Sequence, residues 1–166
     1  VYVNQEARHG LWNYISAHFS MIEKVVGNNY TNEPMAFLLE DSEIQEEIEP
    51  YIMARIVDFE EFIRQYPFDI ISIHDDLHFI IDDPIMECNC GDFSLRWDAA
   101  GNTILERGGT RGETVRCDIQ TLTAMFYGYK RPTYLKRVER LQANDTAVRI
   151  LEDIIPIEQP YFSDYF

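Results

Sequence analysis

The last seven residues of the sequence, 160–166, combine residue types and a position that could do chemistry. Four of the seven are aromatic, although chain ends usually fray and are polar. If this tail is buried, the α-carboxylate of Phe166 is buried with it. Such a group has a pKa of about 3.5 in solution, and its burial is costly unless it is paired or hydrogen-bonded. It could then act as a general base or bind a cation. A tail that only docks against the fold is the alternative, and the residues alone leave both open.

Histidines and cysteines in the middle of the chain are residue types that bind zinc. His74 and His78 precede Cys88 and Cys90, whereas structural zinc sites commonly use C-x-x-C and H-x(3–5)-H spacings. We expect the histidines in a hairpin and the cysteines, two positions apart, on one face of a strand. The pattern therefore predicts no metal site.

Two further motifs invite a functional interpretation that their surroundings do not support. Cys117 precedes a helix that Asp118 is expected to cap, and this carboxylate would oppose formation of the thiolate that a nucleophile needs. The glycine-rich residues 108–112 lack the Lys-Ser/Thr pair of a phosphate-binding P-loop. We expect structural packing for the cysteine and a flexible hairpin for the glycines.

The elements that position these side chains change in character along the chain. Over the first part we expect an amphipathic helix at residues 5–17, because apolar residues recur there at helical spacing. Asp58 and Glu61 match a capping box, which predicts a helix to about residue 65. The other elements expected before that helix are a strand end at 1–4, strands at 21–26 and 51–57, and a short helix at 34–39.

From about residue 68 onward, short strands separated by turns rich in Asp, Asn and Gly predict antiparallel pairing. Asp82 and Asp83 are expected in one of these turns. Helices are expected after Asp118, over residues 132–139, and after a cap at Asn144 or Asp145. The fold class predicted for the chain is α+β, a mixed sheet with helices. The five expected strands are 70–74, 78–82, 92–97, 103–106 and 114–117.

The charge of the chain limits its partners. Against 14 basic residues stand 29 acidic ones, giving a formal charge of −15. Nucleic acid and anionic membranes are disfavoured because binding them requires basic residues, whereas cationic amines are favoured; an acidic surface that only maintains solubility is the alternative.

Three cysteines, an odd number, favour a reducing cytoplasm. The short opening strand and the missing initiator Met suggest a piece of a longer protein.

Three segments carry a family resemblance. They are QEARHGLWNYI at residues 5–15, YIMARIVDFEEF at 51–62 and YFSDYF at 161–166. In this order they resemble the C-terminal part of the enhanced-intracellular-survival (Eis) type of GNAT N-acetyltransferase. The resemblance implies two tandem GNAT-like domains and a C-terminal domain shaped like a sterol carrier protein. It also implies a first domain that binds acetyl-CoA and supplies a tyrosine acid, a C-terminal carboxylate that helps to deprotonate the amine, and a homo-oligomer, commonly a hexamer.

By this resemblance, residues 1–50 are the C-terminal half of the second, structural GNAT-like domain, and residues 51–166 are the sterol-carrier-like domain with its tail. Phe166 would supply the catalytic carboxylate, and Asp164 and Tyr165 would line the pocket for an aminoglycoside or other amine. Some relatives carry an acidic residue where Tyr165 stands, which bears on how strongly a cation is bound.

Several parts of an acetyltransferase are absent from the sequence. No acetyl-CoA pyrophosphate loop, Arg/Gln-x-x-Gly-x-Gly/Ala, occurs in it. We therefore expect acetyl-CoA to bind in an upstream GNAT domain and this chain to be inactive alone. A lipid-binding module and a purely structural oligomerisation domain are the alternative functions.

Overall fold

The computed structural model describes residues 4–29, 36, 43–50, 52–69 and 75–160. The chain forms two compact units, Val1–Ile48 and Glu49–Phe166. Within the described ranges, no helix combines the length and apolar character that crossing a membrane requires.

In the described part of the first unit, α1 (Gln5–Ser16) is the long helix that the sequence predicts. Asn4 caps it, because its side chain accepts a hydrogen bond of 2.9 Å from the amide of Ala7. None of the twelve residues of α1, all of them described, is buried. A short 3-10 helix, η1 (Phe19–Met21), follows.

The strand predicted at residues 21–26 is wrong. Residues 22–29 have no regular structure. A strand needs a neighbour to satisfy its backbone groups, and the described part of this unit offers none. The strand end predicted at 1–4 and the helix predicted at 34–39 fall almost entirely on residues outside the described ranges.

The second unit is built on a five-stranded sheet in the order β3-β2-β1-β4-β5. β1 pairs antiparallel with β2 but parallel with β4, where Phe79 lies opposite Val115. The mixed sheet is confirmed, whereas antiparallel pairing throughout is wrong. The expected strand at 70–74 lies outside the described residues. The strands are β1 (Leu77–Asp82), β2 (Gly91–Trp97), β3 (Thr103–Arg107), β4 (Glu113–Asp118) and the unpredicted two-residue β5 (Gln142–Ala143).

The glycine-rich residues 108–112 are not a hairpin, because β3 and β4 are not neighbours in the sheet. The segment passes over β2, where the Ser94 hydroxyl donates to the carbonyl oxygen of Arg111 at 2.7 Å and accepts from its amide at 2.8 Å. A Cβ on Gly109 would lie 2.7 Å from the Ser94 Cβ, and one on Gly112 2.3 Å from the Asp76 backbone. The glycines therefore permit a close crossover that makes the parallel β1–β4 pair possible.

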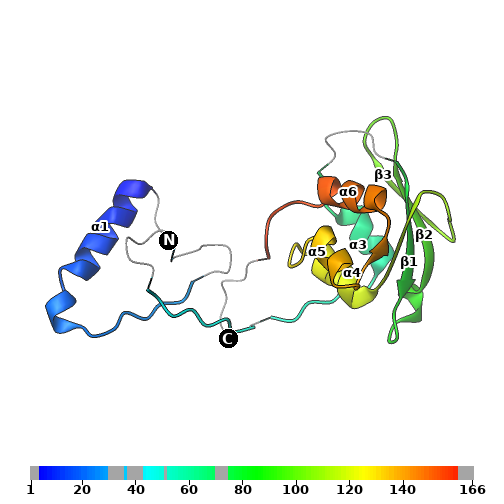
Figure 1. The fold of residues 1–166 in the computed structure, drawn as a ribbon. Coiled ribbons are helices and arrows are strands. Elements are labelled where there is room, and N and C mark those ends of the chain that lie inside the picture. The colour runs from blue at the N-terminus through cyan, green and yellow to red at the C-terminus, as the bar shows by residue number, and fades with distance from the viewer. Residues whose placement is uncertain (1–3, 30–35, 37–42, 51, 70–74, 161–166) are drawn as a thin grey trace. The chain divides into compact units, whose positions relative to one another are not determined.

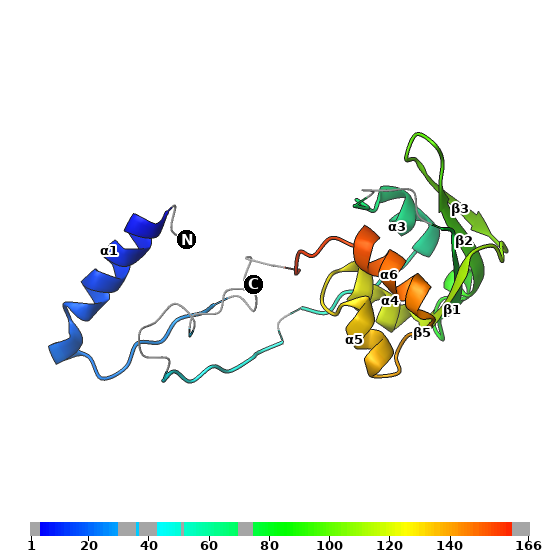
Figure 2. The ribbon, with the colours of Figure 1, turned by 45° about the horizontal axis from the view of Figure 1, so that its top comes forward.

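The helices of the second unit lie on one side of the sheet in both ribbon views (Figures 1 and 2). The predicted caps Asp58, Asp118 and Asn144 are confirmed, since each side chain accepts an amide hydrogen bond three residues ahead. The helices are α3 (Phe59–Gln65), α4 (Ile119–Phe126), α5 (Pro132–Arg137) and α6 (Asp145–Ile154). Between helices and sheet, Phe59, Phe79 and Phe93 are among the largest fully buried side chains of the core.

Three local predictions in this unit are wrong. Residues 52–57 are not a strand; they are irregular and are held by side-chain hydrogen bonds instead of by a neighbouring strand. Cys88 and Cys90 do not share a strand face, because Cys88 lies within the 3-10 helix η2 (Glu87–Asn89), which ends before Cys90. In the capping box, Glu61 bonds Arg64 and Gln65 rather than reaching back.

Candidate functional site

The predicted site residues Asp164, Tyr165 and Phe166 lie outside the described residues, which end at Pro160. The structure does describe the chain that leads to them. We call residues 155–159 the C-terminal segment, and residues 55–59, which lead into α3, the leading segment.

Arg131 holds the start of the C-terminal segment. Its Nη1 donates to the carbonyl oxygens of Ile155 and Pro156 at 2.9 and 3.0 Å, and its Nη2 donates to that of Glu152 at 2.7 Å. The same guanidinium forms an ion pair with the Glu152 carboxylate at 2.6 Å. One side chain thus satisfies carbonyl groups that the end of α6 leaves without helical partners.

Glu152 is itself held from two directions. Its Oε2 accepts from Arg131 Nε at 2.7 Å and its Oε1 accepts from the amide of Thr133 at 2.8 Å. Partial burial opposes ionisation, but these hydrogen bonds and the arginine charge outweigh it and lower the pKa of Glu152. Glu152 therefore stays ionised and fixes the guanidinium.

Gly128 meets the C-terminal segment farther along. It follows α4 with φ of +71°, and a Cβ at this position would lie 2.1 Å from the carbonyl oxygen of Glu158. A glycine just after a helix is a common way to end it. Here the absence of a side chain also leaves room for the passing backbone.

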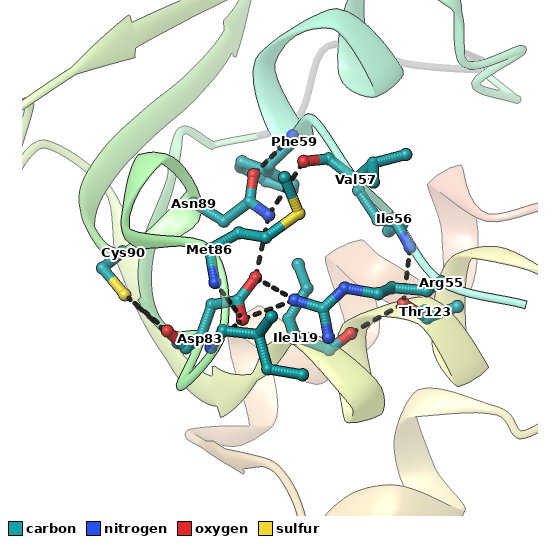
Figure 3. Close-up of polar contacts among 11 residues, drawn as sticks. Arg55, Ile56, Val57, Phe59, Asp83, Met86, Asn89, Cys90, Ile119 and Thr123 are labelled. Atoms are coloured by element: carbon teal, nitrogen blue, oxygen red, sulfur yellow. Dashed lines mark hydrogen bonds and ion pairs between the residues drawn. The ribbon is translucent and has the colours of Figure 1, made fainter.

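The leading segment is anchored by a buried aspartate, drawn with its partners in Figure 3. The Asp83 carboxylate accepts from Arg55 Nη2 at 2.5 and 2.6 Å and from Asn89 Nδ2 at 2.8 Å. The amides of Ile85 and Met86 each donate to it at 3.0 Å. Burial alone would raise the pKa of Asp83, but these hydrogen bonds outweigh it and hold the pKa well below its usual range.

Asn89 and Thr123 extend this anchor to the backbone of the leading segment. Asn89 accepts from the amide of Phe59 at 2.9 Å and donates to the carbonyl oxygen of Val57 at 3.2 Å. The Thr123 hydroxyl accepts from the amide of Ile56 at 3.2 Å. Side chains from η2 and α4 therefore take the place of the strand partners that the sequence predicts (Figure 3).

An open hollow of about 420 Å³ lies beside the leading segment. Phe62, Tyr66 and Tyr127 line part of it, and the rings of Phe62 and Tyr127 stack with centroids 5.8 Å apart. The Tyr66 hydroxyl donates to the carbonyl oxygen of Phe126 at 2.8 Å, and burial raises the pKa of Tyr66 to about 12. This tyrosine is therefore a fixed neutral group of the wall.

The cysteine and histidine motifs of the sequence have structural surroundings and form no reactive site among the described residues. Cys117 is buried; burial, with the Asp118 charge second, raises the pKa of its thiol to about 12. His78 pairs with Asp92 at 2.7 Å. Among the described residues, no three His, Cys, Asp or Glu side chains form a group able to hold a metal ion. His74 lies outside the described residues.

The sequence predictions give none of the residues that hold the two segments this anchoring role. Asp82-Asp83-Pro84 indicates a turn, and the carboxylate of Asp83 does accept the amides two and three residues ahead. Nothing in the neighbouring sequence indicates that Asp83 is buried, because its partner Arg55 lies 28 residues away. For Arg131 the signal was equally weak, because its partners lie 21 to 25 residues ahead. Gly128, directly before a Tyr-Lys-Arg-Pro run, carried the one usable hint of a helix end.

Two families match the chain. Residues 1–56 match the acetyltransferase (GNAT) domain, and residues 59–163 match the sterol carrier protein domain. No curated protein sequence matches the chain.

Solved structures match nearly the whole chain. A protein of Enterococcus faecalis described as a probable N-acyltransferase is 27% identical, with a TM-score of 0.81 over 99% of this chain and 42% of its own. A GCN5-related N-acetyltransferase from Anabaena variabilis is 25% identical, with a TM-score of 0.71 over 96% and 40%. Eis1 from Mycobacterium abscessus, 16% identical with a TM-score of 0.65 over 98% and 41%, shares the fold. The chain thus spans about two fifths of the length of these relatives.

Proposed function

The chain belongs to the sterol carrier protein domain family and carries an acetyltransferase (GNAT) segment ahead of that domain, and on this premise we propose that it works as the C-terminal region of an acetyl-CoA-dependent amine N-acetyltransferase. The main support for this proposal is that the GNAT match and the sterol carrier match follow each other along one chain. A relative described as a probable N-acyltransferase, 27% identical, supports it. Because the chain spans 42% of that relative, the rest of the active site would lie in other parts of the complete enzyme.

Within that enzyme, this chain would supply a proton acceptor. Acetyl-CoA provides the acetyl group as a thioester, and no coenzyme pyrophosphate loop in this sequence is available to hold it. The α-carboxylate of Phe166 takes a proton from the substrate ammonium, directly or through water, so that a neutral nitrogen is available for attack. A group with a pKa of about 3.5 is ionised at neutral pH, and so is free to accept a hydrogen bond from a cationic amine.

The substrate we propose is a cationic amine, an aminoglycoside or another polyamine-like acceptor. The formal charge of −15 attracts such molecules. Asp164 and Tyr165 would line the amine pocket. The scaffold would also supply contacts in a homo-oligomer, a hexamer by resemblance, and sedimentation of the complete enzyme tests that assembly.

The experiment uses the complete enzyme and variants that either lack Phe166 or carry two glycines after it. An aminoglycoside, a polyamine and a lysine peptide serve as acceptors, and release of the coenzyme thiol is followed. We expect kcat to fall about a hundredfold or more in both variants, with the KM for acetyl-CoA unchanged. Normal turnover in both would end the catalytic role of the carboxylate. The chain alone is expected to release no thiol.

A second function, binding of an apolar ligand, is favoured by the sterol carrier match and by the hollow that Phe62, Tyr66 and Tyr127 line. A native mass spectrum of the purified chain tests it. A stoichiometric lipid would support a carrier role, and a spectrum of the unliganded chain alone would dismiss it.

A further inference from the structure

The C-terminal segment is held from two sides before the tail begins. Arg131 bonds its first two carbonyl oxygens, at Ile155 and Pro156. Gly128 leaves space for the carbonyl oxygen of Glu158, where any Cβ would collide. Both groups belong to the connection between α4 and α5. A single stretch of four residues therefore meets the segment at its beginning and near its end.

The arginine is oriented before it meets the segment. The Glu152 carboxylate binds its Nε and Nη2, and the amide of Thr133 holds the other carboxylate oxygen. A guanidinium is planar and its N–H donors point in set directions. Once its orientation is fixed, the positions of the carbonyl groups that it binds are fixed too. A lysine ammonium could keep the charge at this position but could not reproduce these directions.

Prolines limit the segment further. Pro156 lies within it and Pro160 directly follows it, and each restricts its own φ to about −65°. Residues 155–159 have few conformations left once the two contacts are made. Under the proposed function, seven residues, 160–166, then lead to the carboxylate of Phe166.

We propose that Arg131 and Gly128 are positioning residues, which set the point and direction from which the tail begins and so the place that the Phe166 carboxylate can reach. This inference rests on the proposed function. Freeing the segment would lengthen the tether from seven to twelve residues (160–166 against 155–166), which by chain statistics alone lowers the effective concentration of its end about twofold. Loss of direction costs more, because small misplacement of a catalytic group can lower turnover by about a hundredfold.

The experiment compares four variants of the complete enzyme. Arg131→Ala removes the clamp, Arg131→Lys keeps the charge, and Gly128→Ala pushes on the segment from the other side without touching the ion pair. The matched control is Arg137→Ala, which changes the same charge on α5; Arg137 lies over the ring of Tyr134 at 5.2 Å. Steady-state kinetics and the rate at which a carboxypeptidase releases Phe166 are measured below the unfolding transition of each variant.

We expect Arg131→Ala and Gly128→Ala each to lower kcat about tenfold or more, with the KM for acetyl-CoA within about twofold. Release of Phe166 should be several times faster in both. Arg131→Lys should be intermediate and Arg137→Ala should match the parent. A change of twofold or less in kcat and in release would overturn the proposal, because lengthening of the tether accounts for that much.

The variant lacking Phe166 separates the two claims. If it keeps normal turnover, the proposed function fails, while faster release of Phe166 from Arg131→Ala would still support the positioning of the segment. If it loses turnover and Arg131→Ala does not, only the positioning claim fails.

Discussion

The leading segment and the C-terminal segment are both held by an arginine and a carboxylate, but the pairs are built differently. At the leading segment the arginine, Arg55, belongs to the crossing chain and the carboxylate, Asp83, belongs to the fold. At the C-terminal segment Arg131 and Glu152 both belong to the fold, and the crossing chain offers only carbonyl oxygens.

Burial separates the two pairs further. The two arginines are similarly exposed, Arg55 at 29% and Arg131 at 27%, but the carboxylates differ, since Asp83 is 0% exposed and Glu152 is 27% exposed. A buried charge is costly to leave without its partner, whereas a half-exposed pair contributes little to stability because water can replace it. We therefore expect removal of one partner to destabilise the fold more at the leading pair than at the C-terminal pair.

The largest effect on stability is expected from Asp83→Ala. It leaves Arg55, Asn89 and two amides without their acceptor in a buried site. We expect the free energy of unfolding of the chain to fall by about 3 kcal/mol, as measured by urea denaturation. Asp82→Ala, an exposed neighbour, is the control and should change it by less than about 0.5 kcal/mol. Equal effects of the two would remove the distinction between the pairs.

Asn89→Ala should have the next largest effect. Asn89 is buried and connects Asp83 to the carbonyl oxygen of Val57 and the amide of Phe59. Its loss leaves these groups without partners at a cost of about 2 kcal/mol. Urea denaturation measures the cost, and hydrogen exchange at the Phe59 amide should accelerate. An unchanged exchange rate would mean that the leading segment is held by other contacts.

Acid should weaken the leading pair. The folded pKa of Asp83 lies below its unfolded value, so the unfolded chain binds the proton first as pH falls. The stabilisation is complete above the unfolded pKa of about 3.9 and is lost as pH falls from there toward the folded value. Below pH 4, this group should make the free energy of unfolding of the parent protein fall by up to about 1.4 kcal/mol per pH unit. Asp83→Asn should remove that pH dependence. Parallel pH profiles for parent and variant would contradict this account.

Arg131→Ala should have the smallest effect on stability. Because its pair with Glu152 is partly solvated, we expect the free energy of unfolding to fall by about 1 kcal/mol or less. Urea denaturation of the chain checks this value. A loss as large as that of Asp83→Ala would make the arginine a structural residue and would weaken the comparison.

Much of the fold could be predicted because its signals are local. The caps Asp58, Asp118 and Asn144 each act on an amide three residues away, and the four predicted strands that the structure describes are separated by segments rich in Asp, Asn and Gly. The parallel β1–β4 pair could not be predicted, since it depends on a crossover that only glycines at 109 and 112 allow. Residues 52–57 have strand-like composition, yet their partners are the side chains of Asn89 and Thr123.

The candidate site divides in the same way. The aromatic tail was visible in composition, and the three residues assigned to it, Asp164, Tyr165 and Phe166, stay predictions. The residues that hold its approach were not visible, because each of them is ordinary in its local sequence. Arg131 becomes distinctive only when α6 brings residues 152–156 back beside it.

The most direct test of the account removes Arg131 and Phe166, separately and together, from the complete enzyme. Turnover is measured for Arg131→Ala, for the variant lacking Phe166, and for the two changes together. If Arg131 acts only by placing the Phe166 carboxylate, the double variant should be no slower than the variant lacking Phe166 alone. A further loss of about tenfold in the double variant, the product of the separate effects, would contradict the account.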